Sequence, residues 1–263
     1  MNRIDRWFGE HTTPAFIGFA VAGDPDPETS VRVAKTLVSA GVDILELGMP
    51  FSDPVADGPT IQRAGQRALE AGTTPDAVFA IARAIRSSSE VPLVLLTYFN
   101  LVWNRGIEVF YRDARDAGID GILIVDMPVE ESDGVREAAS AVGIAPIFLV
   151  APTTSVVRQD AIIARASGFL YLVSVLGVTG VRDRVAEETV SLIRRVRSRT
   201  GLPLAVGFGI SEPGHAAACC GAGADAVIVG SAIVEIIERH LDDEDAMMAA
   251  LSAYIASMKR TLR

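Results

Sequence analysis

About eight short apolar runs alternate along the chain with amphipathic stretches, and this alternation sharply limits the possible folds. Each run is rich in Val, Ile and Leu and is too short for a buried helix. Continuous apolar runs, without polar residues at every second position, are typical of parallel strands buried on both faces. We therefore predict strands within residues 15–22, 42–48, 92–98, 121–126, 145–151, 168–174, 202–207 and 225–230.

Helix signals recur between the predicted strands. Thr74 can cap a helix that has Pro75 at its first position. Three similar segments, 40–43, 117–120 and 222–225, begin with Ala-Gly and end with Asp directly before an apolar run. The glycine can end a helix in the left-handed conformation, so that a strand follows at once. These three joints indicate one repeated unit of strand and helix.

About eight such units in 263 residues match the size of a (β/α)8 TIM barrel. We predict this fold as a single domain over 1–263, with a short extra N-terminal helix. The alternative is a doubly wound open sheet. It fits less well because no GxGxxG motif follows the first predicted strand.

Composition excludes several classes of partner. The chain carries 24 Lys and Arg against 33 Asp and Glu, a net charge of −9, which argues against nucleic acid as the main partner but not against a small anion. No run of about 18 apolar residues predicts a membrane span, and the start does not resemble a secretory signal. The adjacent Cys219 and Cys220 cannot join distant segments, which favours a cytoplasmic protein with reduced thiols.

Glu46 is a carboxylate in the middle of the second apolar run, three residues after Asp43 near its start. In a barrel, active sites form at the C-terminal ends of the strands. A carboxyl group at such a buried position has a raised pKa, which suits proton transfer near neutral pH. The alternative is a structural ion pair with a buried Arg or Lys, but the other predicted strands supply no such residue.

The loop after this strand, 50–60, contains three prolines and two aspartates. Asp53 and Asp57 lie beside Pro and Gly, where aspartate usually forms turns or caps. Composition alone does not decide whether either of them is catalytic.

Glycine-rich segments follow the last three predicted strands, at 177–180, 207–211 and 230–233. Barrels of this type often bind a phosphate group there, between backbone amides at the N-terminus of a helix. We therefore predict a phosphorylated substrate.

Metal and Schiff-base chemistry are not expected. The three histidines are scattered without ligand spacing, and neither Lys35 nor Lys259 lies at a predicted strand end. The remaining chemistry is acid–base catalysis by carboxylates on a phosphorylated substrate.

The segment 45–62, LELGMPFSDPVADGPTIQ, closely resembles the signature of the tryptophan synthase alpha subunit family. The resemblance runs nearly from end to end and includes shorter matches at 23–25, 126–131, 151–153, 177–180, 207–211 and 230–234. It implies a lyase that cleaves indole-3-glycerol phosphate to indole and glyceraldehyde 3-phosphate by a retro-aldol reaction in tryptophan biosynthesis.

The resemblance also implies roles for individual residues. Glu46 and Asp57 align with the two catalytic carboxylates of the family, and Tyr171 with an active-site tyrosine. The implied phosphate-binding residues are Gly180, Gly209, Gly230 and Ser231. The implied walls of the indole pocket are Phe19, Leu96, Leu123, Leu149, Phe208 and Thr179.

By the same resemblance, the chain needs no cofactor and pairs with a beta subunit in an alpha2beta2 complex. That partner would carry pyridoxal phosphate and receive the indole. The apolar and aromatic segment 99–103, just past a predicted strand end, is a candidate for the contact surface.

One departure concerns Val21, where the family commonly has Thr, so that a hydrogen bond near Asp57 is altered. Two alternatives to the paired enzyme are a free-standing lyase and a catalytically silent activating subunit. A third is a different phosphate-binding barrel enzyme of the same pathway.

Overall fold

Eight parallel strands close into a barrel in this computed structural model, which describes residues 2–173, 182–207 and 209–262 and, for 182–186, the backbone alone. Each strand pairs with its neighbours in chain order, and β1 pairs with β8 to close the ring. The strands are β1 (Ala15–Val21), β2 (Ile44–Gly48), β3 (Leu93–Thr97), β4 (Gly121–Ile124), β5 (Ala145–Val150), β6 (Leu170–Val173), β7 (Leu204–Gly207) and β8 (Ala226–Val229). Each lies within its predicted range, so the predicted (β/α)8 barrel is confirmed.

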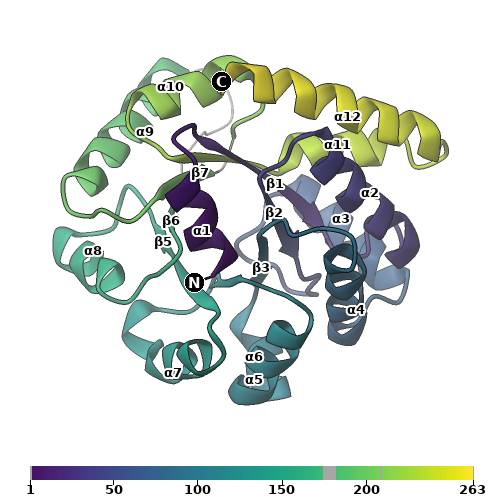
Figure 1. Cartoon of the computed structure of the whole chain (residues 1–263), viewed down its shortest axis with the longest axis horizontal. Helices are drawn as coiled ribbons and strands as arrows, with labels where there is room; N and C mark the ends of the chain where they lie inside the picture. Colours follow the sequence, from purple (N-terminus) through teal and green to yellow (C-terminus); the bar gives the residue numbers. More distant parts are fainter. Residues whose placement is uncertain (1, 174–181, 208, 263) are drawn as a thin grey trace.

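Helices surround the barrel, and α1 lies across one end of it (Figure 1). They are α1 (Arg3–Glu10), α2 (Pro27–Ala40), α3 (Pro59–Glu70), α4 (Pro75–Arg86), α5 (Phe99–Arg105), α6 (Ile107–Asp116), the 3₁₀ turn η1 (Val129–Glu131), α7 (Asp133–Val142), α8 (Val156–Ile163), α9 (Arg182–Arg197), α10 (Pro213–Gly221), α11 (Ser231–Arg239) and α12 (Glu244–Thr261). The predicted N-terminal helix is thus confirmed as α1. The predicted cap is also present, since Thr74 accepts a hydrogen bond from the Ala77 N–H at 3.3 Å.

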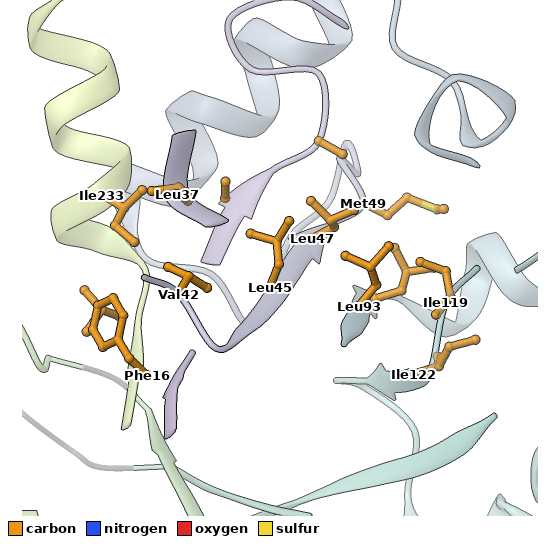
Figure 2. Packing of buried hydrophobic residues seen from close by; sticks show 14 of the residues in the cluster. Phe16, Leu37, Val42, Leu45, Leu47, Met49, Leu93, Ile119, Ile122 and Ile233 are labelled. Carbon is orange, nitrogen blue, oxygen red and sulfur yellow. The ribbon is translucent and has the colours of Figure 1, made fainter. Parts of the chain in front are cut away.

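Two apolar layers separate along each strand because successive side chains point to opposite faces. On β2, Leu45 and Leu47 belong to the outer layer, between the strands and the helices. Leu37 of α2 belongs to the same layer (Figure 2). Ile44 belongs to the inner layer, which fills the barrel. Glu46 has the same parity as Ile44 and therefore points into the barrel.

The three repeated joints fold as their sequence predicts. Each glycine has a positive φ, which a residue without a Cβ adopts readily: 114° at Gly41, 84° at Gly118 and 107° at Gly223. The helix therefore ends, and the next strand begins three residues after the glycine.

The aspartate of each joint fastens one strand to its neighbour. Its carboxylate accepts the backbone N–H of a residue at or near the start of the preceding strand: Asp43 from Phe16 (2.7 Å), Asp120 from Leu93 (2.9 Å) and Asp225 from Leu204 (2.7 Å). A basic side chain neutralises each carboxylate: Lys259 at Asp43, Arg86 at Asp120 and Arg197 at Asp225. Before β6 the corresponding residue is Phe169, which is buried and packs against Phe8 of α1.

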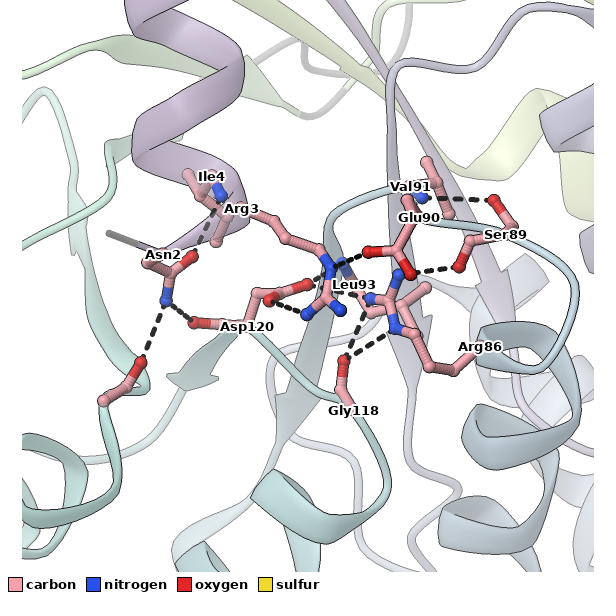
Figure 3. A network of polar contacts seen from close by, with 11 residues as sticks. Asn2, Arg3, Ile4, Arg86, Ser89, Glu90, Val91, Leu93, Gly118 and Asp120 are labelled. Atoms are coloured by element: carbon pink, nitrogen blue, oxygen red, sulfur yellow. Dashed lines mark hydrogen bonds and ion pairs between the residues drawn. The ribbon is translucent and has the colours of Figure 1, made fainter.

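Asp120 also holds α1 on the barrel (Figure 3). Its side chain is 1% exposed and binds both Arg86 (2.9 Å) and Arg3 of α1 (3.1 Å). Asn2, the N-cap of α1, donates to the Asp120 carbonyl oxygen at 2.6 Å. The N-terminal end of the barrel is thus closed by a helix and an ion-pair network.

The helices of the described chain contain no stretch long and apolar enough to cross a membrane.

Asp120→Ala should lower the free energy of unfolding by about 3–5 kcal/mol, because it leaves two guanidinium groups and the Leu93 N–H without their buried acceptor. Urea unfolding followed by circular dichroism measures this. Asp116→Ala, on an exposed position of α6, is the matched control and should change stability by less than about 0.5 kcal/mol. Equal effects of the two substitutions would contradict the role given to Asp120.

Candidate active site

Glu46 lies in the middle of β2 and is 1% exposed. Among the described residues, neither of its carboxylate oxygens has a hydrogen-bond partner, and no basic side chain forms an ion pair with it. Burial, and secondarily the negative charge of Asp57, raise its pKa from 4.5 to about 8. The structure therefore favours the proton-transfer interpretation of Glu46 over the structural ion pair, and the group is protonated at neutral pH.

Asp57 lies on the loop between β2 and α3, half-buried at the mouth of the barrel. Its backbone is held by a hydrogen bond from its N–H to the Pro54 carbonyl (3.1 Å), and its carbonyl accepts from the Gln62 side chain (2.9 Å). Its carboxylate accepts a hydrogen bond from the Tyr98 hydroxyl at 2.9 Å. Partial burial raises the pKa of Asp57, and the bond from Tyr98 opposes this shift.

Asp53 differs from Asp57 in its surroundings. It is exposed, and its carboxylate accepts a hydrogen bond from the neighbouring Ser52 hydroxyl at 2.6 Å. The structure therefore separates the two aspartates that composition could not separate.

Tyr171 lies on β6 and points into the same interior, with 5% of its surface exposed. Burial and the charges of Glu46 and Asp57 raise its pKa well above the ordinary value. Its ring lies against Gly207 of β7, where a Cβ atom would come within 2.5 Å of the tyrosine oxygen. Only glycine leaves room for this ring at that position.

A cavity of about 340 Å³ opens at the C-terminal end of the strands. Predicted site residues that line it are Phe19, Asp57, Leu96, Tyr171, Gly209, Gly230 and Ser231. Residues from β1, β3, β6, the β7 and β8 loops and the β2–α3 loop therefore meet at one place.

The N-terminus of α11 forms one side of this cavity. Gly230 is the N-cap, and it has no side chain to accept hydrogen bonds from the first-turn N–H groups. No Lys or Arg lines the cavity among the described residues. An anion at this position would be bound by backbone amides and by the positive end of the helix dipole.

The other predicted pocket residues do not all reach the cavity. Leu123 lies deeper in the inner layer and is 1% exposed. Leu149 lines a different cavity of about 390 Å³, with Val125 and Val173. Gly180, Thr179 and Phe208 lie outside the described residues.

Several lining residues were missed in the sequence: Ile61, Ile210, Ser211, Ala232 and Glu235. Ile210, Ser211 and Ala232 belong to the glycine-rich segments, so the signal was present. Tyr98, the partner of Asp57, was also missed, although it directly follows β3. The sequence alone does not indicate which residue the hydroxyl of a tyrosine in an apolar run will contact.

A network of ion pairs joins the two helices, α3 and α11, that flank the cavity. Asp24, after β1, is buried and accepts two hydrogen bonds from Arg67 of α3, at 2.7 and 3.0 Å. Arg67 also binds Glu238 of α11 (3.0 Å), which in turn binds Arg63 of α3. The helix that follows the Asp57 loop is thereby tied to the helix that begins at the anion position.

Among the described residues, no group of three or more His, Cys, Asp or Glu side chains is arranged to hold a metal ion.

Comparison with known proteins gives a consistent result. A model of the family described as tryptophan synthase alpha chain matches residues 8–263. The tryptophan synthase alpha chain of Methanoregula boonei is 60% identical over 260 residues, covering 99% of this chain and 98% of the relative. That of Methanothermobacter thermautotrophicus is 47% identical over 245 residues, covering 93% and 91%.

Solved structures agree. Tryptophan synthase subunit alpha of Legionella pneumophila superposes with a TM-score of 0.92 at 37% identity, covering 100% of this chain and 98% of the other. A chain of the tryptophan synthase α2β2 complex of Pyrococcus furiosus gives 0.88 at 36% identity, covering 94% and 99%.

The carboxyl group of Glu46, followed by ¹³C NMR, should titrate near pH 8 rather than near 4.5. In Asp57→Asn the midpoint should fall, because one negative charge is lost, but stay raised, because burial is the larger cause. Since the folded-state pKa exceeds the unfolded one, the contribution of Glu46 to stability should be lost as pH rises from about 4.5 through about 8. A titration midpoint of Glu46 near 4.5 would contradict the finding that its carboxyl group is buried without a partner.

Proposed function

Because this chain belongs to the tryptophan synthase alpha chain family, we propose that it cleaves indole-3-glycerol phosphate to indole and glyceraldehyde 3-phosphate. The observation that carries the proposal is the single cavity shared by Asp57, Tyr171 and the N-terminus of α11. It offers the Asp57 carboxyl group at one side and anion-binding amides at the other. Glu46 does not line this cavity but lies buried on β2, where the charge of Asp57 acts on it.

The substrate has a flat apolar ring at one end and a phosphate at the other. The phosphate binds at Gly209, Gly230 and Ser231, where amides and the helix dipole favour a negative charge. The indole ring lies against Phe19 and Leu96, the apolar side chains of the same cavity. The family resemblance assigns Gly180 to the phosphate and Thr179, Phe208, Leu123 and Leu149 to the indole ring, and we retain these assignments as part of the proposal. Thr179, Gly180 and Phe208 lie outside the described residues, and Leu123 and Leu149 do not line this cavity.

Indole is a poor leaving group as a carbanion, so C3 of the ring has to be protonated before the C–C bond breaks. Glu46 delivers this proton, because its raised pKa keeps it protonated at neutral pH. The resulting carboxylate then accepts the proton of the adjacent glycerol hydroxyl as the bond breaks and the aldehyde forms. Glu46 ends the cycle protonated, so no proton is gained or lost overall.

Protonation at C3 leaves positive charge on the ring nitrogen. Asp57 accepts the indole N–H and stabilises this charge, which requires its ionised form. The two carboxyl groups thus need opposite protonation states at the same pH. Their surroundings support this, since Glu46 is buried without a donor while Asp57 is half-buried and receives the Tyr98 hydrogen bond. Tyr171, which lines the same cavity and is affected by the charges of both carboxyl groups, limits access of water and packs against the substrate.

The partner is a beta subunit in an α2β2 complex, which takes up the indole. Pyridoxal phosphate belongs to that partner, and this chain needs no cofactor of its own. The segment 99–103 supports the pairing: Trp103 is 64% exposed, and its ring lies 6.0 Å from that of Phe99. Val55, on the loop that carries Asp57, is 85% exposed. Exposed apolar groups near the mouth of the barrel suit a protein interface.

Two further proposals follow from the same function. The chain acts in the cytoplasm, which suits its two free cysteines. It acts as one domain, 1–263, because pairing of β1 with β8 joins its two ends in one barrel.

Glu46→Gln should lower kcat for indole release by about 10²–10⁴, because it removes the group that transfers both protons. Asp57→Asn should also lower kcat strongly, whereas Asp53→Asn, on the same loop but exposed, should leave the rate of the isolated chain unchanged. Indole release from indole-3-glycerol phosphate is the measurement. Unchanged turnover by Glu46→Gln would refute the assigned role.

Trp103→Ala should weaken binding of the beta subunit about tenfold or more, since exposed tryptophans at an interface contribute strongly to affinity. Leu241→Ala removes an exposed apolar side chain beyond the C-terminal end of α11, away from the mouth, and should leave binding unchanged. Titration calorimetry with the beta subunit compares the two. Equal affinities for both variants would exclude segment 99–103 from the interface.

A further inference from the structure

The hydroxyl of Tyr98 bridges two neighbouring residues of the catalytic loop. It accepts a hydrogen bond from the Ala56 N–H at 3.2 Å and lies 2.9 Å from Oδ2 of Asp57. Because the Ala56 N–H already points at the tyrosine oxygen, the hydroxyl hydrogen is directed to Asp57. The ring of Tyr98 also stacks on Phe51 of the same loop, with centroids 4.9 Å apart.

Tyr98 itself does not belong to the loop but lies at the end of a barrel strand. It directly follows β3, is the N-cap of α5 and is 1% exposed. Burial and the charge of Asp57 raise its pKa, so its hydroxyl remains protonated and can donate at neutral pH. The position of the Asp57 carboxylate on the loop is thus fixed by a hydrogen bond from a residue at the end of β3.

The other side of Asp57 offers no comparable donor. Val21 lines a small cavity of about 20 Å³ together with Asp57, and its side chain cannot form a hydrogen bond. Among the described residues, Tyr98 is the one side chain that donates a hydrogen bond to the Asp57 carboxylate. It engages Oδ2 and leaves Oδ1 for another donor.

We propose that Tyr98 is a positioning residue: its hydroxyl fixes the Asp57 carboxylate so that Oδ1 can accept the N–H of the indole ring. This inference rests on the role proposed above for Asp57. It assigns to Tyr98 no contact with the substrate.

A shift in pH dependence follows from the surroundings of Asp57. The titratable groups that face it are Glu46 on β2, Tyr98 after β3, Tyr171 on β6 and, across the cavity, Glu235 on α11. Of these, the Tyr98 hydroxyl donates to the ionised carboxylate and so favours ionisation. Without it, Asp57 should take up a proton at a higher pH.

The test compares Tyr98→Phe with Tyr111→Phe in the full-length chain. Tyr111 is also 1% exposed, and its hydroxyl has no partner among the described residues, so it controls for loss of a buried hydroxyl. Phe at position 98 keeps the ring that stacks on Phe51. Indole release is measured against pH for both variants and for Asp57→Asn, with urea midpoints determined on the same samples.

We expect Tyr98→Phe to lower kcat/KM about 10- to 100-fold and to move the acidic limb of its pH profile upward, while Tyr111→Phe matches the unmodified chain. A loss of rate with an unmoved acidic limb would overturn the proposal, because it would show only a structural role. A Tyr98→Phe variant with unchanged rate and profile, beside an inactive Asp57→Asn, would overturn it and leave the proposed function intact. Full activity of Asp57→Asn would refute the function itself.

The ionisation of Asp57 gives a second, independent readout that does not need turnover. Carboxyl ¹³C NMR should give a higher pKa for Asp57 in Tyr98→Phe than in Tyr111→Phe. Identical values in the two variants would overturn the proposal even if both variants lose activity for other reasons.

Discussion

The uncompensated burial of Glu46 is the constraint on which the rest of the site depends. Strand parity forces this side chain into the barrel, where no described basic group meets it. An unpaired carboxylate there is very unfavourable, so the group stays protonated up to about pH 8. A nearby Arg would weaken this effect, as Asp24 illustrates. Asp24 is also 1% exposed, and burial still raises its pKa, but the hydrogen bonds and the charge of Arg67 oppose that shift. Glu46 can act as an acid because it lacks such a partner.

The two ends of the barrel therefore serve different purposes. At the N-terminal end, the buried carboxylate of Asp120 accepts hydrogen bonds from a backbone N–H and pairs with two guanidinium groups, one of which belongs to α1. At the C-terminal end, the carboxyl groups of Glu46 and Asp57 have few partners, and the loops enclose a cavity. The stability supplied at the first end allows the second to keep polar groups in unfavourable surroundings, which is where reactivity arises.

Much of the fold could be predicted because buried parallel strands appear in the sequence as continuous apolar runs, and the Ala-Gly joints mark where three of them begin. Glu46 was found for the same reason, as a charge within such a run. Asp53 and Asp57 could not be separated by local sequence, because both lie beside turn-forming residues; exposure and the bond from Tyr98 separate them. Tyr98 is 41 residues from Asp57 in sequence, so only the closed barrel brings them together.

The same electrostatic constraint explains why the anion position of the cavity has no described cationic side chain. A Lys or Arg near the phosphate would share the cavity with Asp57 and stabilise the ionised forms of the nearby carboxyl groups, including Glu46. Backbone amides at the N-terminus of α11 supply donors and only a partial positive charge, which decays within the first turn. In the function proposed here, binding by amides holds the phosphate while preserving a protonated Glu46, so that an acidic chain with net charge −9 can bind an anionic substrate.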